Sequence, residues 1–292
     1  MKLIVRCDDF GYTNVFNYGL KDALECNVVT HVEIMPDTPG AIDAMQTIRQ
    51  YPWISTAWHV HWWGRPSADP AKIPSLLDEE GKFKFRRDMW DCPEHSAMLD
   101  VDEDEAYLEM QAQMEKYIKY LGKTPDISSY VGISEGPLAK AADRICKDYE
   151  ILPNRECRKM KMAHGNWCPI HTGPRYSEDS RIRNNEYDPL GYLLRDPDGL
   201  LQEDIAMCVF HPGYIDTYMY EDFMFWYKYD RTYFDGCMLV DALALTSPKL
   251  QKWIKENRVE LINYMDAVRG SDYFQEHLKE IGSKLYMREE IA

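Results

Sequence analysis

The chain has 292 residues, of which 45% are hydrophobic and 28% are charged, and its formal net charge at pH 7 is −15. This length can bury a large core, either as one α/β barrel or as two ordinary domains. The acidic balance argues against a nucleic-acid partner, which would need basic clusters, and we find no apolar segment of membrane-spanning length.

The cysteines and the start of the chain indicate the compartment. Eight cysteines are scattered without a compact framework, which is typical of free thiols in a reducing compartment. The first apolar run is too short for an export signal. We therefore expect a cytoplasmic protein. The closing helix could pack on its own barrel or on a second copy, so a homo-oligomer stays open.

The chain begins with an apolar run of strand length at residues 3–5, which leads into the adjacent carboxylates Asp8 and Asp9. Gly11 then releases the backbone into a turn. Ligand sites in parallel α/β folds lie beyond the carboxyl ends of strands. We expect both carboxylates to reach one crevice. The alternative is that they only cap the helix that follows near Asn14.

Strand and helix patterns alternate along the rest of the chain. We predict further strands at residues 28–35, 54–60, 127–133, 205–210 and 259–264. Helices are predicted at residues 17–24, 40–51, 102–121, 137–149, 237–245, 248–256 and 271–286. Irregular stretches at about 62–100 and 154–200 are expected to be insertions that form a lid or a wall of the site. The alternation predicts a single α/β domain over residues 1–292, a distorted TIM-barrel-like (β/α) barrel.

Histidines follow two other predicted strands. His59 and His61 are two residues apart, so on a regular strand they share a face and could both reach one ion. His211 lies where the late strand ends, whereas His31 lies inside a strand and is expected to be a core histidine. Aspartate and histidine together suit a divalent ion such as zinc, which lowers the pKa of bound water. With a carboxylate as general base and a histidine as acid, this set predicts metal-assisted hydrolysis.

Three motifs carry a resemblance to a known family: Asp-Asp-Phe-Gly at residues 8–11, His59 followed by Gly-Arg-Pro at 64–66, and His-Pro-Gly-Tyr at 211–214. In these motifs and over most of its length the chain resembles the YdjC/ChbG-like carbohydrate deacetylases. The resemblance implies removal of an N-acetyl group from a sugar such as a chitooligosaccharide. It also implies a TIM-barrel-like fold related to that of the polysaccharide deacetylases.

The resemblance implies a role for each matching residue. Asp8 would be the general base, Asp9 and His59 would be metal ligands, and His211 would be a general acid or a substrate contact. The implied cofactor is one divalent metal ion, with zinc first and magnesium or nickel as alternatives. The implied partner is a small carbohydrate. Its expected contacts are Arg65, Trp62 and Tyr214.

One motif of the family is missing. The family usually carries Asp-Ser-His-x-His on a middle strand, which supplies another metal histidine. Residues 126–135 read Asp-Ile-Ser-Ser-Tyr-Val-Gly-Ile-Ser-Glu and contain no histidine. His61, His164 or Glu135 could complete the site; otherwise a weaker two-ligand site survives, or the metal is lost.

The missing motif favours a second hypothesis, a carbohydrate-binding protein on a degenerate deacetylase scaffold. A third hypothesis is hydrolysis of a different bond, such as a phosphoester, with the same ion. The sequence lacks a basic, glycine-rich phosphate cradle, which argues against this third hypothesis.

Overall fold

A computed structural model describes residues 1–60, 62, 64–84, 99–130, 135–153, 163–164, 186–219 and 237–288. Across these ranges we find no helix with both the length and the apolarity that crossing a membrane requires. The predicted insertions lie partly outside the described residues, at 85–98, 154–162 and 165–185.

The strands of the described residues form one sheet in which every pair is parallel. Its order is β5 (Leu152–Pro153), β4 (Ile127–Tyr130), β3 (Ser55–Val60), β2 (His31–Ile34), β1 (Lys2–Phe10), β7 (Ile205–Phe210) and β6 (Ala163–His164). The short β8 (Glu260–Leu261) also pairs with β1, beside its first residues. The first strand of the chain is therefore the centre of the sheet.

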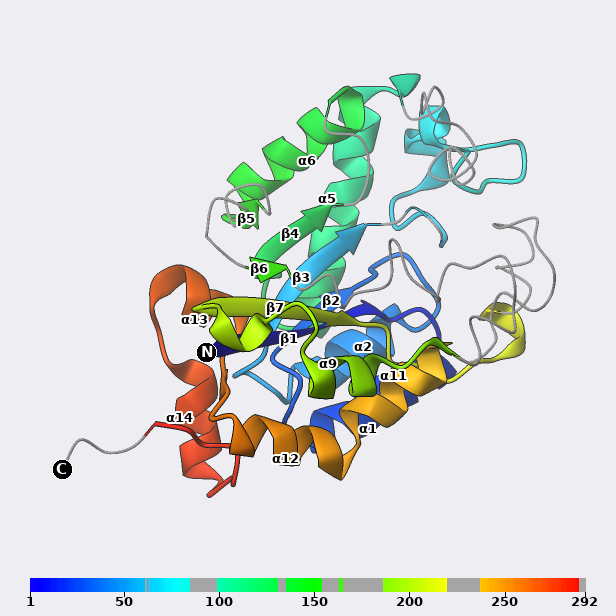
Figure 1. The fold of residues 1–292 in the computed structure, drawn as a ribbon. Helices are drawn as coiled ribbons and strands as arrows, with labels where there is room; N and C mark the ends of the chain where they lie inside the picture. Colours follow the sequence, from blue (N-terminus) through cyan, green and yellow to red (C-terminus); the bar gives the residue numbers. More distant parts are fainter. Residues whose placement is uncertain are drawn as a thin grey trace.

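Helices connect the strands and cover the sheet (Figure 1). They are α1 (Asn14–Glu25), α2 (Ala41–Ile48), α5 (Glu103–Tyr120), α6 (Pro137–Asp148), α9 (Pro189–Arg195), α11 (Cys237–Leu245), α12 (Pro248–Glu256), α13 (Tyr264–Arg269) and α14 (Tyr273–Glu280). Three short 3₁₀ turns are η1 (Pro70–Lys72), η2 (Pro74–Leu76) and η5 (Leu200–Gln202). In Figure 1, α5 and α6 lie side by side beyond β3 and β4, while α1, α11 and α12 lie on the β1 side. This is the predicted distorted, TIM-barrel-like α/β fold.

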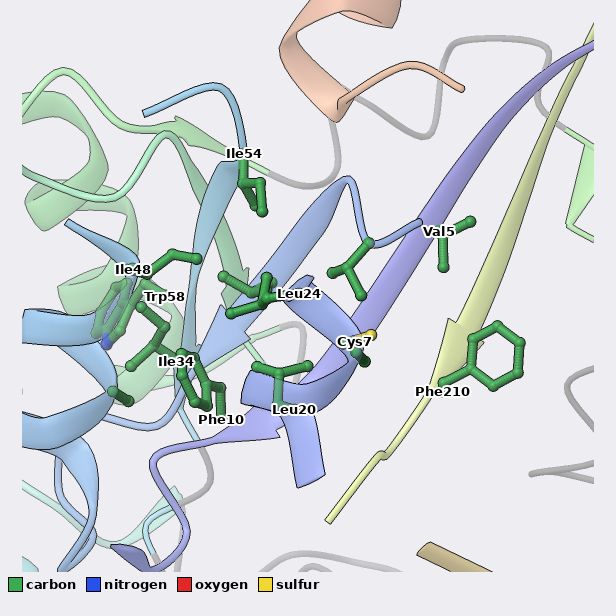
Figure 2. Close-up of a cluster of buried hydrophobic side chains, with 14 of the residues drawn as sticks. Val5, Cys7, Phe10, Leu20, Leu24, Ile34, Ile48, Ile54, Trp58 and Phe210 are labelled. Atoms are coloured by element: carbon green, nitrogen blue, oxygen red, sulfur yellow. The ribbon is translucent and has the colours of Figure 1, made fainter. Parts of the chain in front are cut away.

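The two faces of β1 have different partners because successive side chains of a strand point to opposite sides. Val5 and Cys7 join a large apolar cluster with Leu20 and Leu24 of α1 (Figure 2). Ile4 belongs to a smaller cluster on the other face, with partners from the neighbouring strands: Ala57, Ile127, Met207 and Ile262. Helices therefore cover one face of the sheet, and the opposite face forms the barrel interior.

The structure corrects several boundaries. The first strand continues to Phe10, so both carboxylates lie within it rather than after it. The cap of α1 is Thr13, whose side chain accepts a hydrogen bond from the backbone N–H of Phe16, so the capping role considered for the two carboxylates is wrong. The stretch expected to be irregular contains β6 and α9, and α13 follows the last strand without a predicted counterpart.

Candidate metal and acid–base site

A bulge near the end of β1 brings Asp8 and Asp9 to the same side. Cys7 pairs with Val32 and Phe10 pairs with Ile34, so β1 has one residue more than β2 between these pairs. Asp9 takes a φ of 63°, a left-handed conformation that costs roughly 1 kcal/mol or more outside glycine. Such bulges redirect side chains, and here the regular alternation that would separate two neighbouring residues is interrupted.

Gly11 makes the turn after this bulge. Its φ is 104°, and a Cβ at this position would lie 3.0 Å from the carbonyl oxygen of Met35. Its N–H donates to the side-chain Oδ1 of Asn17 at 2.8 Å, which ties the turn to α1. A glycine is therefore required for the chain to leave β1 in this direction.

The same alternation that buries the apolar cluster directs charged residues into the barrel interior. Arg6 and Asp8 follow Ile4 on the inner face of β1, and His59 follows Ala57 on β3. On β2, Val32 and Ile34 pack outward, so Glu33 between them points inward. Arg6, Asp8, Glu33 and His59 thus meet on the inner face of the sheet, toward the carboxyl ends of β1, β2 and β3.

Ion pairs connect these four residues. The Arg6 guanidinium contacts both Asp8 oxygens, Nε to Oδ1 at 2.5 Å and Nη2 to Oδ2 at 2.7 Å. The same Nη2 lies 2.8 Å from Oε2 of Glu33. That oxygen in turn lies 2.7 Å from Nδ1 of His59. Glu33 and His59 are 1% and 2% exposed, so these charges are almost fully removed from water and their mutual contacts replace it.

The second nitrogen of His59 faces Asp9. Its Nε2 lies 3.2 Å from Oδ1 of Asp9. The Nε2 of His211, directly after β7, lies 3.9 Å from Oδ2 of Asp8 and 3.9 Å from Oδ2 of Asp9. The backbone N–H of His211 donates to the buried carboxylate of Asp241 on α11 at 2.8 Å. The structure thus brings together the four residues predicted to carry the chemistry.

Electrostatics fix the charge states of two of these groups. Burial disfavours the protonated His59 ring, but the charge of Glu33 and the contacts with Asp9 and Glu33 outweigh it and raise the pKa of His59 to about 10. Burial likewise disfavours an ionised Glu33, but Arg6 and His59 hold the pKa of Glu33 well below its ordinary value. In the metal-free protein the two therefore form a charged pair.

A metal ion could bind on one of two edges of the His59 ring. On the Nδ1 edge, Asp8, Glu33 and His59 offer ligand atoms that lie within 4.8 Å of one another. The Arg6 guanidinium already bridges the two carboxylates there, and a second cation would be repelled. On the Nε2 edge, Asp9 supplies an oxygen, and His211 lies nearby. Nitrogen and oxygen donors of this kind fit zinc-like ions, and the Nε2 edge is the better place for one.

The three predicted substrate contacts lie in three different environments. Trp62 is fully buried in the large apolar cluster, edge-on to Phe83. Arg65 is exposed, and its backbone N–H donates to the carbonyl of Asp37 at 2.9 Å. The Tyr214 hydroxyl donates to the Asp22 carboxylate on α1. Their predicted contacts with a sugar stay predictions.

The candidates for a third ligand are only partly described. His61 lies outside the described residues, and for His164 the structure gives only a backbone position in β6, paired with Met207. Glu135 is exposed at the turn before α6. At the position of the missing motif, β4 pairs Ser129 with His59. Paired residues of parallel strands share a face, so a buried serine lies beside the predicted metal histidine.

Sequence reasoning missed Arg6 and Glu33. A signal was present for Glu33, because a carboxylate between two apolar residues of a buried strand must find a charged partner. The partner itself could not be predicted, because Arg6 reaches Glu33 only through the register of β1 on β2, in which Arg6 pairs with His31 and Cys7 with Val32.

The fold and the cluster define a (β/α)-barrel protein that gathers carboxylates and histidines at the carboxyl ends of its strands. The family model of the YdjC-like proteins matches residues 2–256. A carbohydrate deacetylase of Geobacillus stearothermophilus is 30% identical over 90% of this chain and 96% of its own length. Carbohydrate deacetylase 2 of Listeria innocua is 27% identical over 91% of this chain and 98% of its own length. The chain therefore belongs to the YdjC-like family.

A solved structure supports the fold. The crystal structure of an Enterococcus faecalis protein, named as a candidate for cellobiose-phosphate cleavage, matches with a TM-score of 0.61 and 21% identity. The match covers 91% of this chain and 98% of that chain. The two proteins therefore share their overall fold over the matched part of the chain.

Proposed function

We propose that this protein is a metal-dependent deacetylase that hydrolyses the N-acetyl amide of a carbohydrate. The observation that carries the proposal is the convergence of Asp8, Asp9, His59 and His211 from three strand ends, with His211 Nε2 3.9 Å from both carboxylates. Relatives named carbohydrate deacetylases align over nine-tenths of the chain, which supports the substrate class.

Asp9 and His59 would hold the ion, with zinc as the proposed metal and nickel or magnesium as alternatives. An imidazole nitrogen beside a carboxylate favours zinc or nickel, because magnesium prefers oxygen ligands alone. When bound, such an ion supplies Lewis acidity, which polarises a carbonyl and lowers the pKa of a water molecule.

Asp8 and His211 would move the protons. Arg6 holds both oxygens of Asp8, so this carboxylate keeps one orientation as it accepts the proton of the attacking water. An amine leaves poorly unless it is protonated, and His211 Nε2 would supply that proton. The buried Asp241 fixes the backbone of His211 for this role. The products are acetate and the free amino sugar.

Acetate release from N,N′-diacetylchitobiose and a panel of N-acetylated sugars, by protein stripped of metal and resupplied with zinc, tests the proposal. We expect release by the wild type, none by Asp8→Asn although its metal is retained, and none by His59→Ala. Asp104→Asn is the matched control, because its exposed carboxylate pairs with Arg144 on the outside of α5 and its loss should leave release unchanged. Full activity of Asp8→Asn would overturn the role of Asp8, and a metal-loaded wild type that releases no acetate from any sugar would overturn the activity.

A second candidate is carbohydrate binding without turnover. Two observations favour it: the internal Arg6 cation between Asp8 and Glu33, and a serine at position 129 beside His59. This candidate predicts affinity for the same sugars in the presence of a chelator, with no acetate released after zinc is added. Stoichiometric zinc together with turnover would exclude it.

A further inference from the structure

Glu33 has no role in the proposed reaction, yet it contacts a predicted metal ligand. It is 1% exposed and lies on the inner face of β2, where a carboxylate is costly to bury. The fold meets this cost with two cationic neighbours, Arg6 at 2.8 Å and His59 at 2.7 Å. Such an arrangement calls for a functional explanation, since apolar residues would fill the same space more favourably.

The geometry of the His59 ring supplies that explanation. Nδ1 lies 2.7 Å from Oε2 of Glu33, a close ion-pair contact. When an ion occupies Nε2, the single proton of the neutral ring stays on Nδ1, and Glu33 is placed to accept it. The other nitrogen, Nε2, hydrogen-bonds to Oδ1 of Asp9 at 3.2 Å and would release its proton when an ion binds there. A metal-binding histidine generally has its other nitrogen held in this way by a carboxylate or a carbonyl.

We propose that Glu33 is a positioning residue that holds His59 with Nε2 toward Asp9, and that Arg6 fixes Glu33 for this task. The inference rests on the proposed function, because the ion would bind His59 at Nε2. It assigns Glu33 a role distinct from that of a ligand: the two ring nitrogens point away from each other, so a group on Nδ1 does not reach an ion on Nε2.

Arg6 disfavours a metal ion on the Nδ1 edge of the His59 ring. Its Nη2 lies 2.7 Å from Asp8 and 2.8 Å from Glu33, so the guanidinium occupies the place between these carboxylates. It contributes a fixed positive charge where a metal ion would otherwise be attracted to the Nδ1 edge. Arg6 therefore directs a divalent ion to the Asp9 side of the ring and holds Glu33 in place as an acceptor for Nδ1.

The test combines zinc affinity with the nitrogen NMR signals of the His59 ring, assigned by their absence in His59→Gln. In the zinc-loaded wild type we expect coordination at Nε2 and a proton on Nδ1. Glu33→Asp keeps the charge beside Arg6 but withdraws the carboxylate from Nδ1, and we expect zinc affinity to fall about 10- to 100-fold. Glu109→Asp shortens a buried glutamate outside the cluster and should leave zinc affinity unchanged.

Four results would overturn the inference. Coordination at Nδ1 would place the ion between Asp8 and Glu33 and make Glu33 a ligand. Unchanged zinc affinity in Glu33→Asp would reduce Glu33 to a counter-charge, and an equal loss in Glu109→Asp would show that the effect is not specific to this contact. Glu33→Gln, which keeps the reach and loses the charge, should bind zinc more tightly than Glu33→Leu; the reverse order also contradicts the proposal.

Failure of the proposed function gives a different result. If zinc moves no ring signal in the wild type, the metal-dependent activity fails. The contact between Glu33 and Nδ1 of His59 is then measured by NMR in the metal-free protein, where a buried Nδ1 proton beside a carboxylate gives a downfield resonance. Its loss in Glu33→Asp supports the positioning role, and its persistence overturns that role.

Discussion

Two buried glutamates in this protein, Glu33 and Glu109, have pKa values shifted in opposite directions. Glu33 lies beside Arg6 and His59; although burial opposes ionisation, these charges hold the pKa of Glu33 well below its ordinary value. Glu109 on α5 is also fully buried, but its neighbours are N–H groups of Ser67, Ala68 and Gln113. Burial raises the pKa of Glu109 to about 7, and these hydrogen bonds offset only part of the effect.

The comparison separates two uses of a buried carboxylate. Glu109 fastens the loop after β3 to α5 through neutral donors, so it can do this work whether ionised or not. Glu33 must be ionised to hold Arg6 and a protonated nitrogen of His59. Buried cations therefore distinguish the glutamate of the candidate site from the glutamate that holds a loop.

The largest expected effect comes from removing the charge of Glu33. Glu33→Gln leaves the Arg6 guanidinium with one buried carboxylate instead of two, and should destabilise the protein by about 3 kcal/mol at pH 7. Denaturant unfolding measures this difference. Glu109→Gln, the same change at a site where neutral N–H groups hold the carboxylate and Lys116 acts only through its charge, should cost far less. Equal losses in the two variants would contradict the distinction.

The pH dependence of stability should distinguish the same two sites. The pKa of Glu109 is higher in the folded protein, about 7, than its ordinary 4.5, so its contribution is complete below pH 4.5 and is lost as the pH rises through 7. The loss is of the order of 3 kcal/mol. Because Glu109→Gln cannot titrate, the difference between wild-type and variant unfolding free energies should change by this amount between pH 4.5 and 8. A constant difference would show that Glu109 titrates normally.

A smaller effect is expected from restoring a histidine to the barrel interior. Ser129 pairs with His59 on the neighbouring strand, so Ser129→His would add a neutral ligand on the same face. We expect zinc affinity to rise about tenfold, measured by competition with a chelator. Ser129→Ala is the control and should not change the affinity. Equal affinities for all three proteins would mean that position 129 does not face the ion.

The smallest effect is expected at the start of α1. Thr13→Ala removes the hydroxyl that accepts the N–H of Phe16 and should cost about 1 kcal/mol of unfolding free energy, with zinc affinity unchanged. This variant separates capping from ligation at the β1 turn. If Thr13→Ala had no effect on stability while Asp8→Asn weakened the helix, the cap would have to be reassigned.

The sequence allowed much of the fold to be predicted, because apolar periodicity marked most elements. Strand β7 and helices α11 and α12 have the predicted boundaries. Shorter elements were not predicted, because a strand as short as the two residues of β6 has no periodicity of its own and forms only by pairing with β7.

The candidate site was predictable to the extent that its residues follow strand ends. Asp8, Asp9, His59 and His211 could be named because each lies at or near the end of an apolar run. Their charged partners, Arg6 and Glu33, could not be predicted. Arg6 and Glu33 meet only because of the register of β1 on β2. The orientation of Asp9 depends on its positive φ, which no local sequence pattern predicts.

The most direct test of the metal site is the metal content of the purified protein after chelation and resupply with zinc, measured by plasma mass spectrometry for the wild type and Asp9→Asn. We expect close to one zinc per chain in the wild type and a large loss in Asp9→Asn, because Asp9 faces the Nε2 of His59. Zinc at the same stoichiometry in both proteins would contradict a site on Asp9, and no zinc in either would make this barrel a binding protein instead of an enzyme.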